Sequence, residues 1–203
     1  MINNSEIARA KAESIQWAKD TLSNPKTLIV DLETTGILNK DPDSEIVQIT
    51  IINLWEKPLL NMLVRPNSPI GWEALRVHKI TTQMVENSPT FKEISPLLCS
   101  LIEGKHLVSY KADFDIHFIT HMLGKYGFDV PNFTVSCAME NYSKWQGEWN
   151  ETRGSWKWHK LPSLAFGEAH DSFVDCISTL RLIRKMAGEK IQLEDPDMIC
   201  LDF

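Results

Sequence analysis

Five residues in three short motifs are the ones in this sequence best suited to chemistry. They are, in chain order, Asp31, Glu33, Asp115, His170 and Asp175. Four carboxylates brought to one place repel one another and require cations, whereas a histidine beside them supplies a base that titrates near neutral pH. Carboxylates that hold two metal ions, together with such a base, are the equipment for hydrolysis of a phosphodiester.

The first motif, Asp-Leu-Glu-Thr-Thr-Gly, directly follows the apolar run 28–30. On a strand, the spacing of Asp31 and Glu33 places both side chains on the same face. Burial of two acids at the end of a central strand costs free energy unless a metal ion or solvent meets them. Gly36 then permits close approach of the backbone to a ligand. The alternative is that Asp31 and Glu33 are ordinary solvated residues at the end of a strand. A phosphatase loop of the form D-x-D-x-T is disfavoured because the second acid is glutamate.

The other two motifs stand where helices are predicted to begin. Asp115 follows the strand-like run 107–110, and an acid at this place stabilises the positive end of a helix dipole. Ser172 to Asp175 match a capping box, so Asp175 could merely cap its helix and His170 could be an ordinary surface histidine. Each motif alone is explained by local structure. The order of all three along the chain favours one shared site instead.

The bulk composition is that of a globular protein, with 43% apolar and 24% charged residues among 203. This length predicts a single domain, 1–203. No run of 18 apolar residues occurs, so no membrane span is expected, and the polar start at 1–10 predicts no signal peptide. The four cysteines are far apart and fit neither a zinc site nor a disulfide framework. A cytoplasmic protein with free thiols is therefore expected.

The net charge of −6 limits how this chain could hold nucleic acid. Proteins that bind nucleic acid by charge alone are usually basic. A nucleic-acid partner would therefore have to be held locally, through metal ions and a few positioned cations. The acidic balance argues against tight, non-specific binding of duplexes.

Hydrophobic patterns and turn residues predict an α/β fold. Strands are expected at 27–32, 45–55, 59–64, 107–110 and 133–136, and helices at 5–22, 90–101, 113–126, 161–169 and 172–186. The short link 56–58 indicates an antiparallel hairpin. Three strands joined by short links, followed by two that alternate with helices, predict a mixed five-stranded sheet flanked by helices. An antiparallel meander forms one side of that sheet and parallel βαβ strands form the other.

The three motifs resemble those of the DEDDh 3′–5′ exonucleases, the superfamily that includes polymerase proofreading exonucleases, oligoribonucleases and RNase T-like enzymes. The residues DLETTG at 31–36 are very close to the first family motif, and 170–175 has the histidine-type spacing. The segment 77–81, Val-His-Lys-Ile-Thr, resembles the stretch between the first two motifs. The resemblance covers roughly 28–185. Tyr110-Lys111 departs from it, because the family commonly has His-Asn there.

This resemblance implies a ribonuclease H-like fold with a core at about 27–188 and a site for two Mg²⁺ ions, for which Mn²⁺ substitutes. It implies that Asp31 bridges the two ions, that Glu33 and Asp175 complete the first site, and that Asp115 holds the second. His170 would then remove the proton from the attacking water, so that nucleoside 5′-monophosphates are released from 3′ ends.

The resemblance also implies a set of substrate contacts around the first motif. The backbone near Thr34 to Gly36 would contact the terminal nucleotide, and Ile37 or Leu38 would wedge against the terminal bases. Phe114 either stacks a base or packs in the core. The full set of expected substrate-binding residues is Thr34, Thr35, Gly36, Ile37, His78, Phe114, Trp156 and Trp158.

Two further segments have no part in these motifs. Residues 144–160 interleave tryptophans with lysine and arginine, as single-strand binding requires, and base stacking is worth about 1–3 kcal/mol. The alternative is a folded lid, or insertion, whose tryptophans pack onto the domain, and the alternation of Trp156 and Trp158 is typical of a strand. The acidic tail 189–203 is expected to dock on the domain rather than to bind a second subunit or a partner.

The favoured function is metal-dependent 3′–5′ exonuclease activity on single-stranded DNA ends. One alternative is an RNA-directed exoribonuclease or an oligoribonuclease-like enzyme, and another is a non-catalytic nucleic-acid-binding module. The presence of all five site residues disfavours the module. The expected partners are the 3′ end of single-stranded DNA, with RNA as the alternative, a second copy of the chain, and a polymerase or repair protein. No membrane partner is expected.

Overall fold

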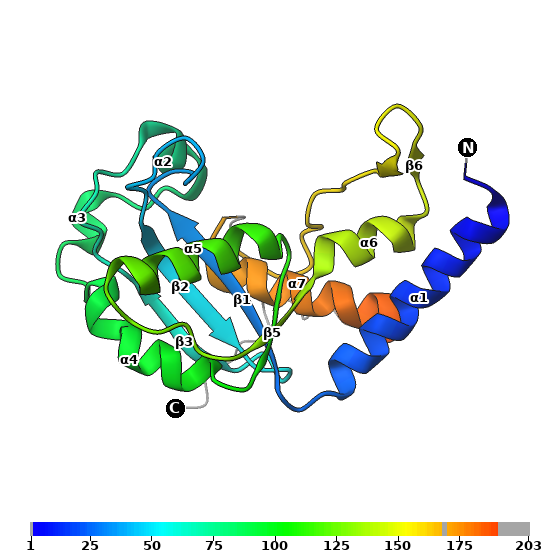
Figure 1. The fold of residues 1–203 in the computed structure, drawn as a ribbon, viewed down its shortest axis with the longest axis horizontal. Coiled ribbons are helices and arrows are strands. Elements are labelled where there is room, and N and C mark those ends of the chain that lie inside the picture. Colours follow the sequence, from blue (N-terminus) through cyan, green and yellow to red (C-terminus); the bar gives the residue numbers. More distant parts are fainter. Residues whose placement is uncertain (1, 168–169, 191–203) are drawn as a thin grey trace.

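The structure, a computed structural model, describes residues 2–167 and 170–190. A long helix comes first, three strands with short links follow, and strands then alternate with helices (Figure 1). The strands are β1 Thr27–Thr34, β2 Ile46–Ile52, β3 Pro58–Leu63, β4 His106–Ser109, β5 Thr134–Cys137, β6 Trp149–Asn150 and β7 Ser155–Trp156. The helices are α1 Asn4–Ser23, α2 Trp72–His78, α3 Thr82–Val85, α4 Phe91–Ile102, α5 Ala112–Lys125, α6 Ala138–Gln146 and α7 Ser172–Ala187.

A five-stranded sheet of order β3-β2-β1-β4-β5 forms the centre of the fold. β1 pairs antiparallel with β2, and β2 with β3, whereas the β1–β4 and β4–β5 pairs are parallel. The predicted mixed sheet, with its meander and its parallel strands, is confirmed. Because β1 and β4 run parallel, with Thr27 beside His106, their carboxyl ends lie at the same edge of the sheet.

Helices cover both faces of this sheet (Figure 1). α4 and α5 pack against one face, where their apolar side chains meet Leu28 and Val30 of β1. α1, α6 and α7 pack against the opposite face, where Ile29 lies among them. Because side chains alternate along a strand, Asp31 and Glu33 continue the face of Ile29 and lie on the side of α7.

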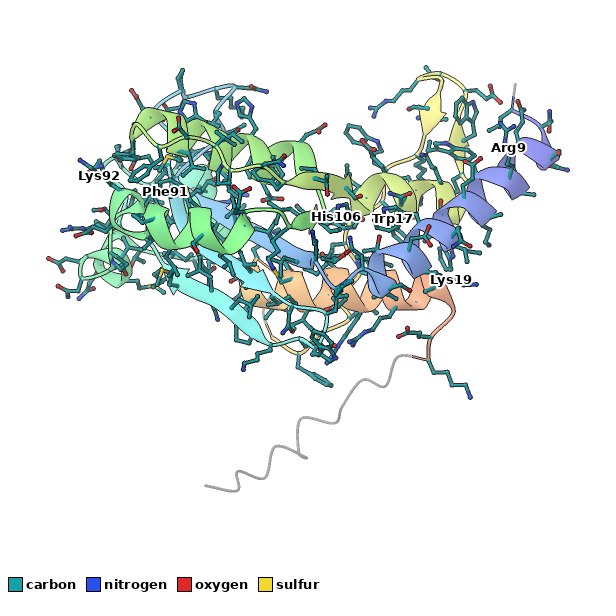
Figure 2. The ribbon with its side chains drawn as sticks, turned by 60° about the horizontal axis from the view of Figure 1, so that its bottom comes forward. Arg9, Trp17, Lys19, Phe91, Lys92 and His106 are labelled. Atoms are coloured by element: carbon teal, nitrogen blue, oxygen red, sulfur yellow. The ribbon has the colours of Figure 1, made fainter. Side chains whose placement is uncertain are left out.

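Helix α4 follows the local signals in its sequence. The hydroxyl of Thr90 accepts a hydrogen bond from the Glu93 N–H, and the Glu93 carboxylate accepts one from the Thr90 N–H, so these two residues form a capping box. Figure 2 shows Phe91 on the side of α5, where its ring lies 6.1 Å from that of Tyr126, and Lys92 directed outward. This contact joins α4 to the helix that begins at the second motif.

Strand β2 is shorter than the predicted 45–55, because it ends at Ile52. The side-chain oxygen of Asn53 accepts hydrogen bonds from the N–H groups of Trp55 and Lys57, which closes a turn. Glu56 lies within this turn at a φ of 61° and forms ion pairs with two arginines of α7. The hairpin link therefore covers 53–57 rather than 56–58.

The prediction of a helix at 161–169 is wrong for residues 161–167, which form no helix in the structure. Residues 168–169 lie outside the described part of the chain. The backbone of 161–167 bonds to α7 instead of to itself. The Leu164 N–H donates to Ser178 Oγ over 3.3 Å, and the Leu164 carbonyl accepts from Arg181 over 3.0 Å. These bonds occupy the groups that a helix would use internally.

The short helices α2 and α3 were not expected from the sequence. α2 follows Gly71 and ends at Lys79, whose φ is 61°. Of the predicted tail 189–203, residues 191–203 lie outside the described part of the chain. Among the helices that the structure does describe, none combines the length and the apolar character needed to cross a bilayer.

Candidate active site

The parallel strands β1 and β4 bring the first two motifs together. Glu33 lies near the end of β1, and Asp115 lies in the first turn of α5, which follows β4. The Asp115 carboxylate accepts hydrogen bonds from the hydroxyl of Ser109, the last residue of β4, and from the N–H of Leu32. Asp115 is 3% exposed. The start of α5 is thus fixed against the end of β1.

Helix α7 brings the third motif to the same edge. The Ser172 N–H donates to Gln48 Oε1 over 3.2 Å, and the Ser172 hydroxyl shares a 2.6 Å hydrogen bond with Thr50. In the β1–β2 register, Thr50 lies opposite Asp31, and Gln48 lies opposite the other acid of the first motif. Polar groups of β2 therefore hold the first residue of α7 beside the two acids of β1.

Asp171, and not Asp175, caps α7. Its Oδ1 accepts hydrogen bonds from the N–H groups of Phe173 and Val174, so the capping box predicted at 172–175 is wrong. Asp175 instead accepts the N–H of His170 over 3.2 Å. Because another residue performs the capping, the Asp175 carboxylate is available to the site.

Glu33, His170 and Asp175 converge. One potential ligand atom from each lies within 4.8 Å of the other two. His170 is exposed, and its φ of 67° places it in the left-handed region, which costs a non-glycine residue about 1–2 kcal/mol. A strained, exposed histidine at the edge of a carboxylate cluster is typical of a functional position.

The electrostatics of the cluster favour a bound cation. Burial, followed by repulsion from Asp175 and Asp115, raises the pKa of Glu33 to about 9. Burial raises the pKa of Asp115 to about 7, although the Ser109 hydrogen bond lowers it. Burial and the neighbouring carboxylates also raise the pKa of Asp31, and burial raises that of Asp175. Without cations, this site therefore retains protons at neutral pH.

The donor set suits hard divalent cations. Carboxylate oxygens are the ligands that Mg²⁺ and similar ions prefer, and a bound cation would remove the repulsion that raises these pKa values. The three-residue group of Glu33, His170 and Asp175 offers ligand atoms close enough to share one ion. The residues present thus fit the metal ions that the sequence motifs imply.

A cavity of about 540 Å³ adjoins the cluster, between the end of β1 and α2. Six of the expected substrate-binding residues line it, namely Thr34, Thr35, Gly36, Ile37, His78 and Phe114. Ile37 and Phe114 also line a second cavity of about 240 Å³, together with Leu38 and Lys111. Ile37 and Phe114 thus stand between two adjoining cavities, and Ile37 is 44% exposed.

Internal hydrogen bonds fix the turn after Glu33. The Thr34 hydroxyl donates to the Gly36 carbonyl over 2.7 Å, and the Thr35 hydroxyl accepts the Glu45 N–H over 2.8 Å. A Cβ on Gly36 would lie 2.8 Å from the hydroxyl of Ser44. Position 36 therefore requires glycine because the Ser44 side chain lies too close to leave room for a Cβ.

His78 anchors the same turn from α2. It is 8% exposed, and its Nδ1 accepts the Ile80 N–H over 2.9 Å. Its Nε2 therefore carries the proton and donates to the Thr34 carbonyl over 3.2 Å. Burial lowers the pKa of His78, which favours this neutral form.

Phe114 packs in the core and also borders the two cavities. Its ring packs 4.9 Å from that of Phe118, a core residue, while its other surroundings are the two cavities. The Lys111 Nζ lies 5.8 Å from the Phe114 ring centroid. Lys111 therefore places a positive charge beside the cavities, and this charge lowers the pKa of Asp115.

The tryptophan-rich segment lies apart from this cavity. Trp156 packs edge to face on Trp149, with ring centroids 5.2 Å apart, in the small β6–β7 hairpin. This hairpin projects beyond α6 in Figure 1. Trp158 is 62% exposed, and neither Trp156 nor Trp158 lines the 540 Å³ cavity. The strand expected from their alternation covers Ser155–Trp156 alone.

Several residues of the site were not predicted from the sequence. Gln48, Thr50 and Ser109 form hydrogen bonds to the motif-bearing helices, and Trp72 lines the cavity. Asp171 had a local signal, since a capping aspartate two residues before helical N–H groups is a common helix start. The others become neighbours of the site only through strand register and tertiary packing.

Comparison with known proteins finds similarity to exonucleases. Residues 28–183 match the family model RNase_T, described as exonuclease. An uncharacterized exonuclease of Escherichia phage 186, CP81, is 36% identical over 185 residues, which cover 85% of this chain and 93% of that protein. The DNA polymerase III subunit epsilon of Pasteurella multocida is 26% identical over 56% of this chain, but the match spans only 47% of that subunit.

Solved structures share the fold at low sequence identity. Exonuclease X in complex with 5′-overhanging duplex DNA has a TM-score of 0.50 and 23% identity, covering 81% of this chain and 95% of that one. E. coli Exonuclease I in complex with a dA16 oligonucleotide has a TM-score of 0.60 and 16% identity, covering 80% of this chain and 42% of that one. The nuclease domain of 3′hExo, a DEDDh family member bound to rAMP, has a TM-score of 0.57 and 16% identity, over 83% and 96%.

The family model covers most of the chain, and the phage exonuclease aligns along nearly its whole length. The mixed sheet confirms the ribonuclease H-like architecture expected from the strand order. Members of this family use divalent metal ions, in agreement with the carboxylate cluster. The chain therefore belongs to the RNase_T exonuclease family and is a 3′–5′ exonuclease of the DEDDh type.

Proposed function

We propose that this chain hydrolyses single-stranded DNA from its 3′ end and releases nucleoside 5′-monophosphates, with two Mg²⁺ ions, or Mn²⁺ in their place. The observation that carries this proposal is the convergence of Glu33, His170 and Asp175 beside a cavity of about 540 Å³, with Asp31 and Asp115 close enough to repel the other carboxylates. The raised pKa values of Glu33 and Asp115 support it, because such a cluster is costly to ionise unless cations bind.

In this proposal, each carboxylate has its own part in holding the ions. Asp31, Glu33 and Asp175 would hold one ion, and Asp31 and Asp115 would hold the other. When bound, the ions supply Lewis acidity, which lowers the pKa of the attacking water and neutralises charge on the leaving 3′ oxygen. The chain keeps the ligands in place through the buried hydrogen bonds that tie α5 and α7 to the sheet.

His170 acts as the general base. Its ring lies beside Glu33 and Asp175, so it accepts the proton of the attacking water as the new bond to phosphorus forms. The bond between phosphorus and the 3′ oxygen breaks, and that oxygen takes a proton from solvent. Because His170 is exposed, it returns its proton to solvent before the next cycle. A positioned base of this kind is worth about 10²–10⁴-fold in rate.

The 540 Å³ cavity receives the terminal nucleotide. The backbone of Thr34 to Gly36 faces it, held by the His78 hydrogen bond to the Thr34 carbonyl. Ile37 is the wedge against the terminal bases, because it is exposed between the two cavities, and Leu38 borders only the smaller one. Phe114 contributes the exposed part of its ring.

DNA is the favoured polymer. Exonuclease I was solved with a DNA oligonucleotide, and Exonuclease X with duplex DNA, which supports a DNA strand here. The second candidate is RNA, because 3′hExo was solved with the ribonucleotide rAMP. Parallel digestion of DNA and RNA strands of one sequence separates these two candidates.

We further propose that the chain forms a single exonuclease domain, with the 144–160 segment as an insertion, and that it works in the cytoplasm. Cys99, Cys137 and Cys176 are free thiols, which supports a reducing compartment. The polymerase subunits among its relatives support recruitment by a polymerase or repair protein. A homodimer is the alternative assembly.

A gel assay with 5′-labelled oligonucleotides tests the substrate. Single-stranded DNA, single-stranded RNA and a blunt DNA duplex of one sequence are incubated with the protein in Mg²⁺, in Mn²⁺ and in EDTA. We expect a descending ladder on single-stranded DNA in either metal and none in EDTA. Faster shortening of the RNA strand would make RNA, and not DNA, the proposed substrate. Faster degradation of the duplex would overturn the single-strand preference.

A further inference from the structure

Helix α2 presents an exposed tryptophan at the rim of the catalytic cavity. Trp72 is 66% exposed and lines the 540 Å³ cavity with Glu33 and Ile37. Tryptophan is usually well buried, because its large ring contributes much apolar contact. What sets Trp72 apart from the other exposed tryptophans, Trp55 and Trp158, is its place beside the carboxylates, where its ring is accessible to a ligand.

Both ends of α2 are fastened to the catalytic turn. At its start, the Gly71 N–H donates to the Thr35 carbonyl over 2.8 Å, and a Cβ on Gly71 would lie 2.9 Å from the same oxygen. At its end, His78 donates to the Thr34 carbonyl over 3.2 Å. Glycine thus permits the close contact, and Trp72 is held at a fixed position relative to the carboxylates.

A cation accompanies the tryptophan. The Arg76 guanidinium carbon lies 5.5 Å from the centroid of the Trp72 ring, one helical turn away. Within the described part of the chain, this guanidinium has no carboxylate partner. By contrast, Lys40 at the same rim is paired with Glu73 over 3.4 Å. Arg76 is therefore a cation available to a phosphate in a protein whose net charge is −6.

We propose that Trp72 and Arg76 form a nucleotide-binding subsite, in which a base of the incoming single strand stacks on Trp72 and Arg76 contacts the adjoining phosphate. This proposal rests on the proposed function, since the strand enters the same cavity. Single-strand binding uses stacking on aromatic rings together with cations, and stacking tolerates any base because every base has a π-face. Trp156 and Trp158, the tryptophans favoured by the sequence, do not line this cavity.

Binding is measured by fluorescence polarisation of a labelled DNA strand in an Asp31→Asn background, where the strand is not consumed. We expect Trp72→Ala to weaken binding about 5–140-fold, the equivalent of about 1–3 kcal/mol. Trp72→Phe should retain most of the affinity. Trp55→Ala is the matched control, because Trp55 is 75% exposed in the β2–β3 turn and should bind like the parent.

A strand with abasic 3′-terminal nucleotides separates stacking from a structural effect. On this strand the parent and Trp72→Ala should bind alike, because no base is present to stack. For Arg76→Gln, the slope of log affinity against log salt concentration should fall by about 0.7, as expected for the loss of one phosphate contact on a single strand.

Unchanged affinity in Trp72→Ala, or an equal loss on normal and abasic strands, would overturn the subsite. An unchanged salt slope in Arg76→Gln would remove Arg76 from it. Failure of the proposed function would look different, because wild-type protein would then leave every labelled strand intact in metal. A wild type that degrades single-stranded DNA while Trp72→Ala binds normally would thus refute the subsite alone.

Discussion

The backbone N–H of His170 donates a hydrogen bond to Oδ2 of Asp175 over 3.2 Å. One turn at the start of α7 therefore sets both the proposed general base and a proposed metal ligand. The left-handed backbone of His170, with a φ of 67°, makes this bond while its side chain stays exposed. Because the bond comes from the backbone, the side chain of His170 can be removed without removing it.

His170→Ala should lower the rate of DNA hydrolysis by about 10²–10⁴-fold. The rise in Tm on addition of Mg²⁺ should stay close to that of wild type, since the N–H that supports Asp175 remains. Single-turnover rates and thermal shifts with and without Mg²⁺ check these two expectations. A wild-type rate at neutral pH would exclude His170 as the base.

Without metal, the protein should become less stable as the pH rises. Glu33 has a pKa of about 9 when folded against 4.5 ordinarily, so the folded state holds its proton more tightly than the unfolded state. The free energy of unfolding therefore falls with rising pH between 4.5 and 9. Each unit of raised pKa corresponds to about 1.4 kcal/mol, and therefore to about 3–6 °C in Tm for a domain of this size.

Thermal melts in EDTA across this pH range check the effect, and Glu33→Gln is the matched control. The amide keeps the shape of the side chain but does not ionise, so the melting temperature should depend less on pH and should exceed that of wild type at alkaline pH. The variant should also be inactive. Equal melting temperatures of the two proteins at pH 9 would contradict the raised pKa.

Thr50→Val should destabilise the fold and weaken its response to metal. It leaves the buried Ser172 hydroxyl without its 2.6 Å partner, which costs about 1–3 kcal/mol. Because Ser172 begins the helix that carries Asp175, the Mg²⁺-induced rise in Tm should shrink as well. In the double variant Thr50→Val, Ser172→Ala, both partners are apolar, and much of the stability should return. Additive losses in the double variant would rule out the coupling.

Trp156→Ala should lower stability and leave the KM for DNA unchanged. Trp156 packs edge to face on Trp149, and such pairs are worth about 0.5–1.5 kcal/mol beyond the area they bury. Trp149→Ala, which removes the other ring, should behave in the same way. Melting temperatures and KM values for the two variants check this. A raised KM with an unchanged Tm would restore the tryptophan-rich segment as a substrate-binding surface.

The sequence was sufficient to predict the sheet and the face on which its acids lie. Asp31 and Glu33 are two residues apart, so they must lie on the same face of the sheet, because side chains alternate along any strand. The long apolar runs and the order of strands and helices then gave the mixed sheet. Local rules failed at the start of α7, where the match at Ser172 to Asp175 suggested a capping box although Asp171 is the cap.

The remaining parts of the site depend on tertiary contacts that no local pattern contains. Helix α2 spans seven residues, too few for a clear hydrophobic period, and its position comes from hydrogen bonds to Thr34 and Thr35. Trp72 therefore could not be assigned to the cavity in advance. The segment 161–167 contains residues compatible with a helix, but Ser178 and Arg181 on α7 bind the backbone groups of Leu164 instead.

The most direct test compares wild type with Asp31→Asn on 5′-labelled single-stranded DNA, in Mg²⁺ and in EDTA, after both proteins are shown to be folded by their thermal melts. We expect a ladder of strands shortened from the 3′ end for wild type in Mg²⁺ and intact label in every other lane. Hydrolysis by Asp31→Asn at the wild-type rate, or by wild type in EDTA, would contradict a metal-dependent site built on the β1 carboxylates.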